Sequence, residues 1–127
     1  RVTHEVTKPA LAWVGTEAET LCDLPALTAP HVFFEGSARE AARRFPQNAN
    51  VALTTALAGL GPEATTLRLI ADPTAKANRH RVVATGAFGR MEITLDNAPL
   101  ASNPKSSALT ALSLVRLIEN RTTPLVI

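Results

Sequence analysis

Short segments in which apolar and polar residues alternate place the strongest constraint on how this chain folds. An alternation of period two is typical of a β-strand with one buried side and one solvent-facing side. Strands are predicted on this ground, or from a short apolar or β-branched run, over Val2–Thr7, His31–Glu35, Thr66–Ala71, Arg81–Ala87 and Arg90–Leu95. The chain therefore predicts a sheet of about five strands.

The connections between the later strands limit their order. Residues 72–80 are too few to hold a long crossover helix, so we expect the two flanking strands to be antiparallel neighbours. The Gly86–Gly89 stretch is typical of a hairpin turn or bulge. The expected connections make the sheet largely antiparallel.

Helices are predicted over residues 17–21, 38–45, 51–60 and 106–120. Ser37 and Glu40 have the spacing of a capping box at the start of the second helix. Either Asn48 or Asn50 can cap the third, whose nearly uniform apolar character predicts a buried helix.

We expect one α+β domain over residues 1–127, with a mixed, largely antiparallel sheet and helices packed on one face. If helices cover only one face, the other face must be polar or meet a partner. We expect a partner, because apolar residues occupy alternate sides of several strands: Val2, Val6, Ile70, Val82 and Ala84.

Composition removes several classes of function. The chain has 13 basic and 11 acidic residues, a net charge of +2 and no basic run, and few aromatic residues, so nucleic-acid binding is disfavoured. No apolar run approaches the roughly 18 residues of a membrane span. A lone cysteine, Cys22, excludes an internal disulfide, and the wide spacing of the three histidines gives no support to a metal site. The start at Arg1, without Met and inside an alternating segment, suggests a piece of a longer protein.

Histidines are the side chains best suited to proton transfer at neutral pH. His4 lies on the apolar side of its strand and is expected to pack in the core, and His31 is expected at the surface. His80 differs because it ends a polar loop and begins a strand, where a rigid scaffold can hold a catalytic group. Cys22 has no cationic or histidine neighbour in sequence, which predicts an inert thiol.

Two further segments are candidates for binding small molecules. In Asn48–Asn50, one asparagine can cap a helix while the other offers its amide to a ligand. Lys105 and Ser106 open the last predicted helix and can bind a carboxylate or phosphate, or can be a simple cap with a solvated lysine. No glycine-rich nucleotide-binding motif is present in the chain.

Six ordered motifs together resemble the C-terminal, catalytic half of the L-aspartate dehydrogenase family. They run from residue 34 almost to the C-terminus, with small departures at Leu53 and in the Ser106–Ser107 pair that leave the proposed chemistry untouched. The motifs are Phe34–Ala41, Phe45–Ala52, Ile70–Pro73, Asn78–His80, Gly86–Gly89 and Asn103–Ser107.

The resemblance implies an N-terminal Rossmann domain that binds NAD or NADP and is missing from this chain, a homodimer, and a cytoplasmic enzyme. Family members interconvert L-aspartate and oxaloacetate plus ammonia, and supply iminoaspartate to NAD biosynthesis. The family's active-site histidine falls on His80, and its asparagine that contacts the nicotinamide falls on Asn50. Lys105 and Ser106 become candidates for binding a substrate carboxylate.

The expected function is therefore the catalytic and dimerisation domain of an L-aspartate dehydrogenase, inactive when separated from its cofactor domain. A rival reading is a dimerisation or interaction module that keeps this fold without catalysis. A third is another dehydrogenase, because dihydrodipicolinate reductase and homoserine dehydrogenase have related C-terminal domains. The set Asn48–Val51, His80 and Asn103–Ser107 fits that third reading less well.

Overall fold

The computed structural model describes residues 1–100, 103–107 and 112–118. The chain divides into two compact units, Arg1–Asp96 and Asn97–Ile127. The first unit carries the main sheet and its helices, and the second carries a small two-stranded sheet.

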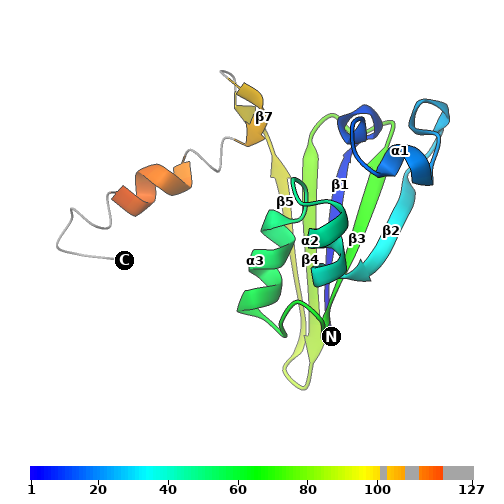
Figure 1. Ribbon diagram of the computed structural model, residues 1–127. Helices are drawn as coiled ribbons and strands as arrows, with labels where there is room; N and C mark the ends of the chain where they lie inside the picture. The colour runs from blue at the N-terminus through cyan, green and yellow to red at the C-terminus, as the bar shows by residue number, and fades with distance from the viewer. Residues whose placement is uncertain (101–102, 108–111, 119–127) are drawn as a thin grey trace. The chain divides into compact units, whose positions relative to one another are not determined.

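The first unit is built on a five-stranded mixed sheet in the order β2-β3-β1-β4-β5 (Figure 1). β1 runs parallel to β3 and antiparallel to β4, and β2 runs antiparallel to β3. Only two residues separate β4 from β5, which makes this pair an antiparallel hairpin. The predicted fold class is confirmed. The strands are β1 (Val2–Pro9), β2 (His31–Ser37), β3 (Thr65–Asp72), β4 (Asn78–Gly86) and β5 (Gly89–Asn97).

One expected connection is wrong. β3 and β4 are not neighbours, because β1 lies between them and pairs with both. The loop 73–77 crosses the end of β1, a span of two strand spacings, or about 10 Å, which five residues can bridge. β1 therefore becomes the central strand of the sheet.

Helices α2 (Ala38–Arg44) and α3 (Asn50–Ala58) lie on one face of the sheet (Figure 1). The Ser37 hydroxyl accepts a hydrogen bond of 3.1 Å from the Glu40 N–H, so this half of the predicted capping box is confirmed. The Glu40 carboxylate pairs with Arg44 one turn later. Between β1 and β2 run the short helices η1 (Ala10–Trp13), α1 (Ala18–Leu21) and η2 (Leu24–Ala26).

The prediction that the third helix is buried and capped by an asparagine is wrong. α3 is preceded by Ala49 and has no side-chain cap. Only its alanines Ala52 and Ala56 are buried, whereas Val51 and Leu57 are exposed. Small side chains let the helix approach the sheet closely, and the larger apolar ones point outward.

The core lies between the helices and the sheet. Phe33 and Phe34 are both buried, although neighbouring strand residues normally face opposite sides. A register shift between Val32 and Phe34 forms a bulge that turns both rings inward, where each stacks edge-on against Phe45. Trp13 is fully buried and its indole N–H donates to the Ile70 carbonyl at 3.1 Å.

The other face of the sheet carries a row of charged side chains, so the apolar second face inferred from the sequence is wrong, whereas the expected partner stays a prediction. Val6 and Ala84 are buried on the helix side. On the opposite face, Glu5 lies between Arg68 of β3 and Arg81 of β4, with N–O distances of 2.8 and 2.9 Å. The row continues outward to Glu35 of β2 and Glu92 of β5. Carboxylates and guanidinium groups thus alternate across all five strands.

The second unit contains the antiparallel strands β6 (Pro99–Leu100) and β7 (Asn103–Ser107). The helix predicted over 106–120 is therefore wrong at its start, although residues 112–118 are helical. Serine has no strong helix preference, and pairing of Ser107 with Pro99 gives this stretch backbone partners that a helix start lacks. Residues 108–111, 119 and 120 of that prediction lie outside the described residues.

We predict that the Leu69→Ala variant loses about 2–5 kcal/mol of unfolding free energy, because Leu69 is fully buried and its truncation leaves a cavity. Leu95→Ala is the matched control, since Leu95 lies on edge strand β5 and is 45% exposed. Urea unfolding should show a much smaller loss for the control. Equal losses in the two variants would contradict this description of the core.

Candidate active site

His80 lies near the start of β4 and is held by a second histidine. It pairs in register with Val6 of β1 and faces the helix side of the sheet. His4 lies two residues before Val6 on the same side, and its Nε2 is 3.0 Å from Nδ1 of His80. The rings meet edge-on, His4 is fully buried and His80 is 7% exposed. The prediction that His4 packs in the core is confirmed, but its contact with His80 was not foreseen.

One hydrogen lies between the two rings, and its placement decides the chemistry of His80. If His4 donates, neutral His80 carries its hydrogen on Nε2. If His80 donates from Nδ1, its Nε2 has a free lone pair and can act as a base. The second placement puts the hydrogen of neutral His4 on Nδ1, which is buried and has no partner in the described part of the chain. An unsatisfied buried group of this kind costs about 1–3 kcal/mol.

Lys8, at the end of β1, lies on the same side as His4 and Val6. Its ammonium donates to the Asn48 side-chain oxygen at 2.5 Å and lies 4.9 Å from the centre of the Trp13 ring. Asn48 belongs to the segment that leads into α3, so this bond ties that segment to the sheet. His4, Lys8, Asn48 and His80 are called the histidine–lysine cluster below.

Burial controls protonation in the histidine–lysine cluster. It lowers the pKa of His4 to about 4, with a smaller effect from the charge of His80. Burial also lowers the pKa of His80, and the positive charge of Lys8 adds to this shift. The pKa of Lys8 is itself lowered by burial. At neutral pH both imidazoles are therefore mainly uncharged, the form in which a histidine can accept a proton.

Asn50 is the first residue of α3 and its side chain is exposed. In the part of the chain that the structure describes, its side-chain amide makes no hydrogen bond. It does not cap α3, so the carboxamide is available to a ligand. A nicotinamide carboxamide has the complementary donor and acceptor, and Asn50 fits such a group chemically.

Comparison with known proteins identifies the family. Residues 1–121 match the family described as "Aspartate dehydrogenase, C-terminal". The chain is 53% identical over 126 residues to L-aspartate dehydrogenase of Brucella anthropi, covering 99% of this chain and 47% of that protein. It is 59% identical over 113 residues to L-aspartate dehydrogenase of Pseudomonas aeruginosa, covering 89% and 42%. The chain belongs to the aspartate dehydrogenase family.

A solved structure agrees with this assignment. The crystal structure of aspartate dehydrogenase from Thermotoga maritima matches with a TM-score of 0.74 and 30% identity, covering all of this chain and 46% of that one. The chain spans less than half the length of these aspartate dehydrogenases.

The predicted site residues of this family member fall in both units. His80 and the segment around Asn48 and Asn50 lie in the first unit, where Lys8 links that segment to the strand beside His80. Lys105 and Ser106 lie in strand β7 of the second unit, so their expected position at a helix start is wrong, whereas their binding of a carboxylate stays a prediction. Sequence reasoning missed His4 and Lys8 as site residues. The signal was present, because residues 4, 6 and 8 of one strand must face the same side.

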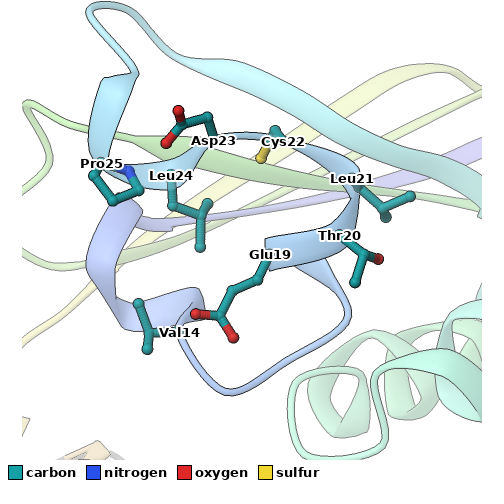
Figure 2. Close-up of a pocket in the computed structure, with 8 residues that line it drawn as sticks. All are labelled: Val14, Glu19, Thr20, Leu21, Cys22, Asp23, Leu24 and Pro25. Atoms are coloured by element: carbon teal, nitrogen blue, oxygen red, sulfur yellow. The ribbon is translucent and has the colours of Figure 1, made fainter.

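A pocket of about 450 Å³ lies elsewhere in the first unit, among the residues that link β1 to β2 (Figure 2). Cys22 is among its lining residues, and its pKa is raised by burial and by Asp23, which agrees with an inert thiol. Among the described residues, no group of three or more metal-ligating side chains comes together. Within the same residues, no helix is long and apolar enough to cross a membrane.

We predict that stability falls by about 2 kcal/mol through His4 alone between pH 7 and pH 5. The unfolded histidine takes up a proton near pH 6.5, whereas the folded one does so only near pH 4, so acid favours the unfolded chain. Buried His80 shifts in the same direction. Urea unfolding at both pH values measures this loss of unfolding free energy. The loss should be smaller in His4→Phe than in wild type, and equal to wild type in the control His31→Phe, which changes an exposed residue. An identical dependence in wild type and His4→Phe would contradict the assignment.

Proposed function

We propose that this chain is the C-terminal catalytic and dimerisation domain, residues 1–127, of an NAD(P)-dependent L-aspartate dehydrogenase. The observation that carries this proposal is a buried His80 whose Nδ1 is held 3.0 Å from Nε2 of His4, in a chain of the aspartate dehydrogenase family. The hydrogen bond fixes the imidazole ring and leaves Nε2 for the substrate.

The reaction converts L-aspartate to iminoaspartate, which water then hydrolyses to oxaloacetate and ammonia. His80 is the acid–base residue: its Nε2 takes a proton from the attacking water and returns it to the departing nitrogen. The base form requires His80 to donate from Nδ1 to His4. A pKa below the ordinary histidine value keeps His80 uncharged, and so able to accept that proton, at neutral pH.

Asn50 is proposed to orient the nicotinamide ring by hydrogen bonds to its carboxamide. When bound, the nicotinamide accepts the hydride that leaves the substrate Cα. Its remaining contacts, and the choice between NAD and NADP, are assigned to an N-terminal cofactor domain. The prediction that Lys105 and Ser106 bind a substrate carboxylate stays a prediction.

The wider setting is also proposed. We place the full protein in the cytoplasm as a homodimer that supplies iminoaspartate to NAD biosynthesis. These statements follow from the resemblance to the L-aspartate dehydrogenase family, to two members of which the chain is 53% and 59% identical.

We predict that His80→Ala, in the full protein with its cofactor domain, lowers kcat for L-aspartate by about 100-fold or more, because general acid–base catalysis contributes that much. Exposed His31→Ala is the control and should retain wild-type kcat. Initial rates of cofactor reduction measure both. A His80→Ala kcat within about tenfold of wild type would overturn the catalytic role and favour a non-enzymatic module.

The 127-residue chain alone should not turn over, because it lacks the proposed cofactor domain. A spectrophotometric assay with L-aspartate and NAD or NADP checks this. Addition of the separately expressed cofactor domain is the positive control and should restore turnover. Normal turnover by the chain alone would contradict the proposal that the active site is shared between this chain and a cofactor domain.

A further inference from the structure

Lys8 stands apart from the other basic groups that are held in place in this fold. Its ammonium is half-buried, yet it makes no ion pair with any described carboxylate. Its contacts are one neutral amide oxygen, from Asn48, and the face of Trp13. The arginines held by carboxylates, by contrast, are Arg39, Arg44, Arg68, Arg79, Arg81 and Arg90.

This arrangement is costly for the folded chain by itself. A lysine is seldom buried without a partner of opposite charge, because desolvation disfavours the charged form. The lowered pKa of Lys8 reflects that cost. The contact with Asn48 uses one of three N–H donors, so the ammonium keeps donors for a further acceptor.

The position of Lys8 in β1 places any further hydrogen-bond acceptor bound to its ammonium beside His80. Lys8 is two residues beyond Val6, which pairs with His80, so Lys8 and His80 are diagonal neighbours on one side of the sheet. Diagonal pairs of this kind have side chains within reach of a small molecule that contacts both. The positive charge of Lys8 lowers the pKa of His80, in agreement with this placement.

We propose that the Lys8 ammonium, held by Asn48 and Trp13 beside His80, anchors a carboxylate of the substrate. The proposal rests on the proposed function and extends it by naming the residue that binds a carboxylate of the substrate. The anchored carboxylate supplies the missing counter-charge and places the adjoining carbon and nitrogen next to Nε2 of His80.

Carboxylate binding also has a consequence for protonation. The groups that face His80 from β1 are His4 and Lys8, and Asn48 in the segment before α3 is neutral. Arg79 and Arg81 point to the opposite face, where Asp96, Glu92 and Glu5 pair with them. An anion on Lys8 therefore offsets the one nearby charge that lowers the His80 pKa, and that pKa should rise when ligand binds.

Steady-state kinetics of the full protein is the first test. Lys8→Gln should raise KM for L-aspartate about 10- to 100-fold, the value of a charge-assisted hydrogen bond, with a smaller change in kcat and none in KM for the cofactor. Lys8→Arg should recover part of the loss because it restores the charge. Lys76→Gln, an exposed lysine in the loop 73–77, is the matched control and should behave as wild type. An unchanged KM in Lys8→Gln would overturn the proposal while leaving the proposed function intact.

Succinate binding to the 127-residue chain is the second test and needs no catalysis. The His80 ring signals in NMR should shift on titration with succinate, and the His80 pKa should rise, whereas uncharged succinamide should have no effect. Lys8→Gln should weaken succinate binding at least about tenfold. Equal binding by wild type and Lys8→Gln, or equal binding of succinamide, would overturn the proposal. If succinate binds through Lys8 but the full protein does not oxidise L-aspartate, the proposed function fails and the carboxylate site stands.

Discussion

The pairing of β1 with both β3 and β4 is the constraint on which the candidate site depends. β1 is the first strand in sequence but the central strand of the sheet, so its side chains are covered by neighbours on both edges. His4 becomes fully buried there, and Lys8 is carried to the end of the sheet beside His80. Without this order, the histidines would lie 76 residues apart in sequence with no contact. A polar contact in the interior is stronger than one in water, but only while the sheet keeps water away from it.

The two faces of the sheet divide structural and chemical tasks. Glu5 and Val6 are consecutive residues, yet Glu5 joins the row of ion pairs on the open face while Val6 packs under the helices. Each charge in that row meets an opposite charge on the neighbouring strand, which opposes a slip in register, because a one-residue shift would turn these side chains to the wrong face. The helix side keeps its polar groups few: among the buried residues they are His4, Thr65 and His80. The unpaired charge of Lys8 is therefore conspicuous on that side.

Much of the fold could be predicted from local pattern, and the errors have physical causes. Alternation and short apolar or β-branched runs located all five strands of the main sheet, and Ser37 located the start of α2. Pattern could not show that β1 inserts between β3 and β4, since strand order depends on long-range pairing. The pattern also predicted that α3 is buried, but its alanines rather than its larger apolar residues face the sheet. It predicted a helix start where β7 lies, because local pattern does not include the strand pairing that forms there. For the candidate site, the motifs pointed to His80 and Asn50, whose roles stay predictions. His4 and Lys8 needed the face assignment of β1 and its register against β4, which only the three-dimensional structure provides.

Besides burial, the hydrogen bond between His4 and His80 disfavours protonation of His80. A protonated His80 carries hydrogens on both nitrogens, so its Nδ1 must donate to Nε2 of His4. Neutral His4 must then hold its own hydrogen on Nδ1, where no acceptor lies among the described residues. The free-energy cost of that unsatisfied N–H disfavours protonation of His80. Desolvation of the charged ring and repulsion by Lys8 disfavour it as well. All three act in the same direction in the free protein. In the proposed complex, a carboxylate on Lys8 would offset the field of Lys8, so the His80 pKa would rise when the substrate is bound.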